Sequence, residues 1–212
     1  MRAIRKGPEP ASLTEHRCTP GADYESYPDK DALRQYLVRE QRGLCCYCLS
    51  RIRAERGSMK IEHWHCQAGY ETEQLDYSNL LGACMGGEGD KPEFRHCDTR
   101  KGDRIISKNP ANPEHRIEET IHYRGDGTIT STDPAFEKEL NEVLNLNVHF
   151  LKNNRKGALD GFKEFLSKKK GARTPQELEK QLRKWNGELD TGELQPFCEV
   201  VLYYIRKRLA LL

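Results

Sequence analysis

Ile61-Glu62-His63-Trp64 is the stretch around which this 212-residue sequence is organised. It places a carboxylate directly beside an imidazole, and cysteines lie on both sides of it along the chain. A carboxylate binds hard cations such as Mg²⁺, and a neutral imidazole accepts a proton near pH 7. The alternating pattern from Met59 to Trp64 predicts a short strand. In a strand His65 would share a face with His63, so His65 is a second candidate for the same role.

Four cysteines around this stretch have the number and the spacing of a zinc site. Cys45 and Cys48 form a C-x-x-C pair, in which two sulfurs of one turn can reach a single tetrahedral ion. Cys84 and Cys97 supply a second pair, with twelve residues between them. We therefore predict that these four thiolates hold a structural Zn²⁺.

Two other interpretations of the cysteines remain open. A single C-x-x-C pair is also typical of a thiol redox protein, and the thiols could simply be unliganded. Cys66 and His96 are alternative zinc ligands. The remaining thiols, Cys18, Cys46 and Cys198, have no expected ligand role.

The composition favours a small core that would benefit from a bound metal. Hydrophobic residues make up 36% of the chain and charged residues 32%, so little apolar surface is available for burial. No stretch has the apolar length of a membrane span, and the N-terminal residues lack the apolar segment of a secretory signal. We therefore expect a cytoplasmic protein, in which cysteines serve as ligands or free thiols and not as disulfides.

Positive charge is concentrated toward the C-terminus although the formal net charge is only +2. From Lys152 to Lys184 there are eleven Lys or Arg residues and four Asp or Glu residues. Such a segment is either a solvated helical face or a surface that follows nucleic-acid phosphates. Composition alone does not choose between these two interpretations.

Turn residues and apolar spacing predict the remaining elements. Residues 1–28 are expected to be extended, with a helix beginning near Asp29 or Asp31. A helical turn is expected over Tyr77–Leu81, an irregular segment over Gly82–Lys91, and a short helix at His96–Lys101. Downstream, Ile117–His122 and Thr128–Ser131 predict a hairpin, and further helices are expected to begin near Asp133, Leu146, Thr174 and Pro196.

The order of these motifs resembles the HNH endonuclease family over roughly residues 43–103. The shared features are C-x-x-C, a carboxylate followed by His63, Asn79-Leu80, and Cys97 followed by a polar residue and Lys101. Met1-Arg-Ala-Ile-Arg-Lys and Leu144-Asn-Leu-Asn are similar to one subfamily more specifically. That subfamily is the HNH nuclease subunit found with an ATPase in Septu-type and retron anti-phage defence systems.

The resemblance implies a role for each matching residue. His63 corresponds to the general base, Glu62 to the metal ligand before it, and Asn79 to the residue that steadies the loop bearing the base. Asp98 stands where the family commonly has Asn or His as a second metal ligand. Glu62 in place of Asp, Asp98 in place of Asn or His, and the wide Cys84–Cys97 gap depart from the common pattern. Two carboxylates suit Mg²⁺ or Mn²⁺, and Lys101 or Arg100 could add charge at the phosphate.

Together these observations predict an α+β fold with a small, zinc-stapled ββα-metal core and a predominantly helical C-terminal part. We expect a lead-in and helix at residues 1–42, the nuclease core at 43–110, and a hairpin with helices at 111–212. The expected activity is metal-dependent hydrolysis of DNA, with RNA as the alternative, alongside an ATPase subunit. The competing hypothesis is a zinc-ribbon module that binds nucleic acid or protein without catalysis.

Overall fold

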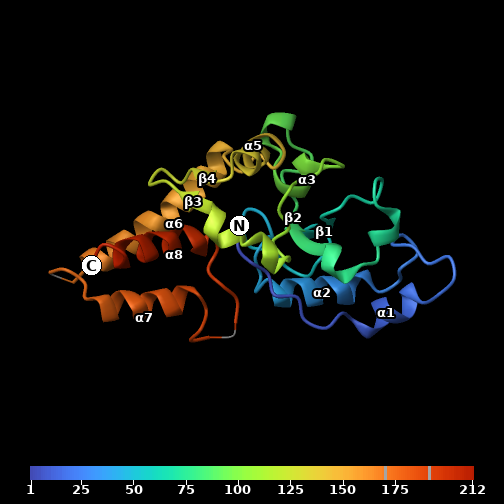
Figure 1. Ribbon diagram of the computed structural model, residues 1–212, viewed down its shortest axis with the longest axis horizontal. Coiled ribbons are helices and arrows are strands. Elements are labelled where there is room, and N and C mark those ends of the chain that lie inside the picture. Colours follow the sequence, from blue (N-terminus) through green and yellow to red (C-terminus); the bar gives the residue numbers. More distant parts are fainter. Residues whose placement is uncertain (170, 191) are drawn as a thin grey trace.

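The computed structural model describes residues 1–169, 171–190 and 192–212. Figure 1 shows two ends of the molecule: α1, α2, β1 and β2 lie at one end, and α6, α7 and α8 at the other. The longer helices are α1 (Ala11–Arg17), α2 (Lys30–Glu40), α5 (Pro134–Glu142), α6 (His149–Ser167), α7 (Pro175–Trp185) and α8 (Cys198–Leu209). The short ones are α3 (Cys97–Lys101) and α4 (Ile117–Thr120), with 3₁₀ turns at Glu71–Glu73, Tyr77–Asn79, Pro92–Phe94 and Pro113–His115.

Two antiparallel strands form the centre of the first end. β1 (Met59–His63) pairs with β2 (Leu80–Cys84), so that Met59 lies opposite Cys84 and His63 opposite Leu80. The predicted strand is confirmed, except that it ends at His63 and leaves Trp64 and His65 in the following loop. α2 packs on β2, and α3 lies against the same strand.

β2 is a strand that the sequence pattern did not indicate. The helical turn expected over Tyr77–Leu81 is confined to Tyr77–Asn79. The segment expected to be irregular from Gly82 begins inside the strand β2 and is irregular only after Cys84. All five residues of β2 are buried, so they show none of the apolar–polar alternation that marks a half-exposed strand. Gly82 lets its neighbours pack closely, because a Cβ atom there would lie 3.0 Å from Ile52 Cδ1, which would have to shift.

The N-terminal segment is not extended throughout, as residues 1–28 were expected to be. α1 begins directly after Pro10, and Leu13 on this helix is fully buried. Proline is compatible with the start of a helix because its missing N–H would have no helical partner there. The next helix, α2, begins beside Asp29 as predicted and buries Leu33 and Leu37.

The hairpin predicted after residue 116 is confirmed in a shorter form. β3 (Ile121–Tyr123) pairs with β4 (Ile129–Ser131), whereas Ile117–Thr120 forms the helical turn α4 and not the start of the strand. Asp133 caps α5 as predicted, since its carboxylate accepts hydrogen bonds from the N–H groups of Ala135 and Phe136. The helix expected from Leu146 begins at His149, after Asn145 in a left-handed conformation.

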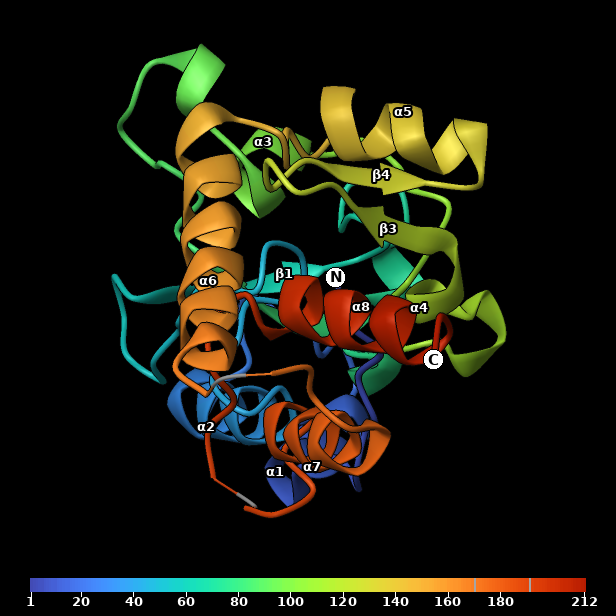
Figure 2. The same ribbon diagram turned by 90° about the vertical axis from the view of Figure 1, so that its left-hand side faces the viewer.

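Three helices make up the second end of the molecule. α8 packs against both α6 and α7, as Figure 2 shows. Thr174 and Glu177 form the capping box of α7 that the sequence predicted. The last helix begins at Cys198, two residues beyond the predicted Pro196, and buries Val200, Val201 and Ile205.

The main hydrophobic core joins residues from widely separated parts of the chain. It includes Met1, the cysteine turn at 45–48, strand residues of both hairpins, and Leu151 at the start of α6. The division of the chain at residues 42 and 110 stays a prediction. No helix among the described residues has both the length and the apolar character needed to cross a membrane.

Candidate metal centre and catalytic site

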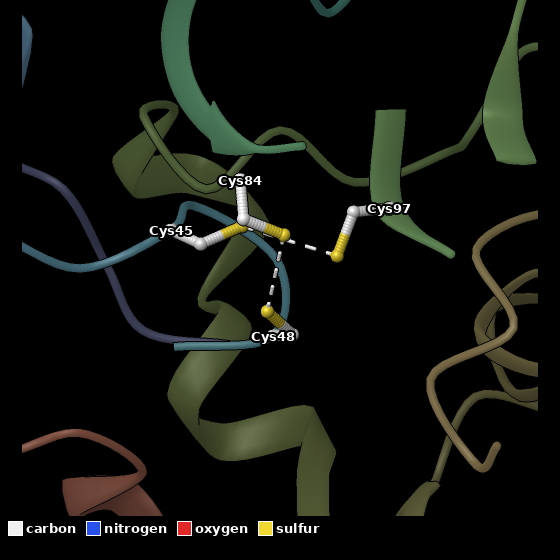
Figure 3. Close-up of side chains that lie close together, drawn as sticks. All are labelled: Cys45, Cys48, Cys84 and Cys97. Carbon is white, nitrogen blue, oxygen red and sulfur yellow. Dashed lines mark hydrogen bonds between the residues drawn. The ribbon is translucent and has the colours of Figure 1, made fainter. Parts of the chain in front are cut away.

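Four buried cysteines converge between the β1–β2 strand pair and α3 (Figure 3). Cys45 and Cys48 come from one turn, Cys84 ends β2, and Cys97 begins α3. Their sulfur atoms all lie within 4.8 Å of one another, with Cys45 Sγ 3.9 Å from Cys97 Sγ and Cys48 Sγ 3.7 Å from Cys84 Sγ. The four predicted ligands are therefore brought together in one group that could hold a metal ion.

The spacing of these sulfurs fits a tetrahedral zinc ion. Zn–S bonds of about 2.3 Å separate tetrahedral sulfur ligands by about 3.8 Å. Burial alone would raise the pKa of Cys45, but hydrogen bonds from the neighbouring thiols outweigh it and hold that pKa well below its usual range. Burial and the neighbouring thiols raise the pKa of Cys97 well above its usual range, so the pKa values do not identify four thiolates, and it is the sulfur spacing that suits a structural zinc ion.

The other candidate ligands lie outside this group. His96 Nε2 is 3.7 Å from Cys84 Sγ, so His96 neighbours the group without belonging to it. Burial raises the pKa of the Cys46 thiol well above its usual range, which disfavours the thiolate form. The backbone of Cys46 pairs with β2, because its N–H donates to the Gly82 carbonyl oxygen. Cys66 is half-buried, Cys18 is exposed, and Cys198 is buried in a different hydrophobic cluster.

Glu62 and Asp98 form an acid pair beside the cysteine group. Glu62 is 2% exposed and lies on β1, whereas Asp98 follows Cys97 on α3. Burial raises the pKa of Glu62 well above its usual range, and contact with the Asp98 carboxyl raises it further. Two carboxyl groups in such contact need a shared proton or nearby positive charge, and Lys60 Nζ lies 3.7 Å from Asp98 Oδ2. The structure thus brings the two predicted cation ligands together.

A lysine ammonium lies within the same buried site. Lys101 Nζ is 2.9 Å from Glu62 Oε1 and donates to the His63 carbonyl oxygen at 3.0 Å. The residue is 1% exposed, so the prediction that Lys101 or Arg100 adds charge at the phosphate stays untested, and direct contact is open to Arg100 more than to Lys101. The charge of Lys101 compensates the buried Glu62 carboxylate, as a buried ion requires.

His63 is held in a defined orientation at the end of β1. Its Nε2 atom lies 3.0 Å from the Gln74 carbonyl oxygen, which can only accept a hydrogen bond. The neutral ring therefore carries its proton on Nε2 and its lone pair on Nδ1, 3.3 Å from Gln67 Nε2. Burial lowers the pKa of His63, so the neutral, proton-accepting form is favoured.

Asn79 ties the loop after His63 to the strand that follows. Its Oδ1 accepts from the His65 N–H at 2.7 Å, and its Nδ2 donates to the carbonyl oxygens of His65 and Glu73. His65 itself is stacked between Trp64 and Tyr70, and its Nδ1 lies 2.6 Å from Glu73 Oε2. The expectation that His65 continues the strand and shares the face of His63 is wrong, because the strand ends at His63.

Three residues of this site escaped the sequence reasoning. The Tyr47 hydroxyl donates to Glu62 Oε1 at 2.7 Å, and Gln67 and Gln74 contact the His63 ring. The position of Tyr47 inside the C-x-x-C turn was a signal for it, since a central residue that does not bind metal must point elsewhere. Nothing in the sequence indicates the glutamines, whose contacts depend on how the loop folds back.

The cationic C-terminal segment is partly neutralised by its own acids. Among the described residues, Lys168 pairs with Glu164 at 3.8 Å, and Lys169 forms an ion pair with Glu177. The neighbouring Lys170 lies outside the described residues. These two pairs favour the solvated-face interpretation for the lysines concerned.

Comparison with known proteins connects the chain to one class of enzyme, the HNH endonucleases. No family model matches the sequence. A protein from Escherichia coli whose name describes it as an HNH endonuclease of retron Ec83 is 30% identical over 79 residues. The matched region is 32% of this chain and 31% of that protein, so the similarity spans about a third of each. It supports a link to HNH endonucleases over part of the chain.

Proposed function

We propose that this protein is a metal-dependent HNH endonuclease that hydrolyses phosphodiester bonds of DNA. The observation that carries the proposal is the contact between the buried Glu62, on β1, and the half-buried Asp98, on α3, beside the oriented ring of His63. The partial similarity to an HNH endonuclease supports the same class. In this proposal β1, β2 and α3 are the two strands and the helix of the ββα-metal core.

Phosphodiester hydrolysis requires an activated water and compensation for negative charge on the phosphate. His63 is the proposed general base, with Nδ1 as the nitrogen that accepts the proton of water. Gln67, which lies near that nitrogen, is exposed and can be displaced by substrate. Asn79 holds the loop that follows the base. A bound Mg²⁺ or Mn²⁺, held by Glu62 and Asp98, would supply charge compensation at the phosphate oxygens.

The cysteine group has a structural role in this proposal. Cys45, Cys48, Cys84 and Cys97 would hold Zn²⁺, which would fix the turn at 45–48 against the ends of β2 and α3. The resemblance to the Septu-type and retron subfamily supports two finer proposals. The chain would act in anti-phage defence, and an ATPase subunit would be its partner.

Cleavage of supercoiled plasmid DNA and of a structured RNA, with Mg²⁺ or Mn²⁺, tests the activity. Each reaction is run with and without a co-expressed ATPase. We expect divalent-dependent cleavage by the wild type and a loss of about 100-fold or more in His63→Ala, the lower range for general-base catalysis. His149→Ala is the matched control, because His149 is exposed on α6.

Two results would contradict this proposal. If His63→Ala cleaves as fast as the wild type, His63 is not the base. If the wild type binds zinc and nucleic acid yet cleaves nothing under any of these conditions, the non-catalytic zinc-ribbon module is the better description. Cleavage of RNA alone would change the substrate and keep the enzyme class.

A further inference from the structure

Tyr47 connects the cysteine turn to the acid pair. It lies between Cys46 and Cys48, and its side chain is completely buried. The hydroxyl reaches out of the turn and donates to Glu62 Oε1 at 2.7 Å. A hydrogen bond from a neutral donor to a buried carboxylate is strong and directional, so it fixes the rotation of that carboxylate.

Lys101 reaches the same oxygen atom from a different chain segment, the helix α3. It lies on α3, four residues after Cys97, and its ammonium is 2.9 Å from Glu62 Oε1. The same ammonium donates to the His63 carbonyl oxygen at 3.0 Å. Each of the two donors is therefore carried by a segment that also supplies sulfur atoms to the cysteine group.

We propose that Tyr47 and Lys101 are positioning residues that hold the Glu62 carboxylate through its Oε1 atom. The other oxygen of Glu62, Oε2, is then left to bind the catalytic cation together with Asp98. This inference rests on the proposed nuclease function. It gives the cysteine group a second effect besides stabilising the fold. Because the metal-binding segments carry both donors, they also set the orientation of the carboxylate at the catalytic site.

The hydroxyl of Tyr47 can be removed without changing the shape of the core. Tyr47→Phe keeps the aromatic ring and deletes only the donor to Glu62. Tyr27→Phe is the matched control, because Tyr27 is also buried and its hydroxyl makes one hydrogen bond, at 2.9 Å to Ser12 Oγ. Tyr27 belongs to a different hydrophobic cluster, so the Tyr27→Phe variant measures only the general effect of deleting a buried hydroxyl group.

Direct titration with Mn²⁺ by calorimetry, on zinc-loaded protein without nucleic acid, measures the proposed effect. We expect the Kd for Mn²⁺ to rise about tenfold in Tyr47→Phe, the size of a hydrogen bond to a charged group, with zinc content unchanged. Tyr27→Phe should keep the wild-type Kd. The Mn²⁺ concentration that gives half-maximal cleavage should shift in Tyr47→Phe by the same factor as the Kd.

A second background shows whether Tyr47 acts through Glu62. In Glu62→Gln the hydroxyl no longer faces a carboxylate ligand, so adding Tyr47→Phe should change the Mn²⁺ Kd no further. If Tyr47→Phe binds Mn²⁺ like the wild type, or if its effect is undiminished in the Glu62→Gln background, the positioning role is wrong. A wild-type protein that neither binds Mn²⁺ nor cleaves would overturn the proposed function itself.

Discussion

Glu62 and Lys101 place a carboxyl group and an ammonium in a nearly water-free site, and the half-buried carboxyl group of Asp98 lies beside them. Burying a charge costs several kcal/mol unless an opposite charge and hydrogen bonds compensate it. Lys101 and Tyr47 compensate Glu62, whereas the contact with Asp98 adds a second acid that raises the pKa of Glu62. Asp98 has a lysine partner of its own, since Lys60 Nζ lies 3.7 Å from its Oδ2 atom, so a test must separate a role in the ion-pair network from a role in catalysis.

Replacement of Asp98 by alanine should separate catalysis from stability. The variant keeps the Glu62–Lys101 pair as a balanced ion pair, so its melting temperature and zinc content should stay close to those of the wild type. Divalent-dependent cleavage should be lost, because one proposed cation ligand is gone. Cleavage assays over a range of Mg²⁺ concentrations check this, with the exposed Asp103→Ala as the control. Wild-type rates at limiting Mg²⁺ would show that another group, such as His96, binds the cation.

Gln41 is a second residue whose side-chain hydrogen bonds connect separate segments of the core. Its Nε2 donates to the carbonyl oxygens of Leu44 and Gly82, each at 2.7 Å, and its Oε1 accepts from the Gly82 N–H at 2.6 Å. These bonds join the end of α2, the approach to the cysteine turn and β2.

Gln41→Ala should lower the free energy of unfolding by about 3 kcal/mol, because it leaves buried backbone groups unsatisfied. Chemical denaturation measures the change. Gln35→Ala, on the exposed face of the same helix, should change the stability by less than about 0.5 kcal/mol. A similarly small change in Gln41→Ala would mean that water replaces the lost hydrogen bonds.

At the scale of elements, the C-terminal helices are specified mainly by their ends and their buried faces. α7 begins with a reciprocal capping box between Thr174 and Glu177, and it buries Leu178 against the neighbouring helices. A short helix gains little stability from propensity alone, so its caps and its packing on α8 decide whether it forms.

Thr174→Ala removes the hydroxyl that accepts from the Glu177 N–H. We expect the free energy of unfolding to fall by about 1 kcal/mol, the usual loss for a helix N-cap. Amide hydrogen exchange should speed up at the start of α7, and the metal centre should keep its zinc. Thr72→Ala, at an exposed position in another part of the chain, is the comparison variant. Equal protection of α7 in both variants would show that packing alone sets this helix.

The cysteine group links distant parts of the molecule, because three separate chain segments meet there. The turn at 45–48, the end of β2 and the start of α3 meet at these sulfurs, and the main core surrounds them. A core of this modest size would gain a large part of its stability from a metal ion that bound these thiolates only in the folded chain.

Purified wild-type protein should contain one zinc ion per chain, and Cys45→Ser or Cys97→Ser should yield metal-poor or insoluble protein. Chelation should likewise lower the melting temperature of the wild type. Elemental analysis and thermal denaturation check both expectations, with Cys18→Ser as the control because Cys18 is exposed and outside the group. Well-folded protein without any zinc would contradict the assignment of this cluster.

The sequence by itself determined the local features with strong chemical signals. The strand at Met59–His63, the caps of α5 and α7, and the four cysteines of the cluster all follow from residue type and spacing. Turn residues, caps and metal-ligand spacing act over a few neighbours, so they can be recognised without knowing the rest of the fold.

Only the tertiary structure decided which side chains face one another across the site. β2 escaped prediction because a fully buried strand has no alternation, and α1 escaped because prolines conceal a helix start. Lys101 forms an ion pair with the buried Glu62, and Tyr47 links Glu62 to the cysteine turn, through contacts between segments distant in sequence. Sequence spacing cannot give these contacts, because they depend on how the β1–β2 strand pair, the turn at 45–48 and α3 pack together in space.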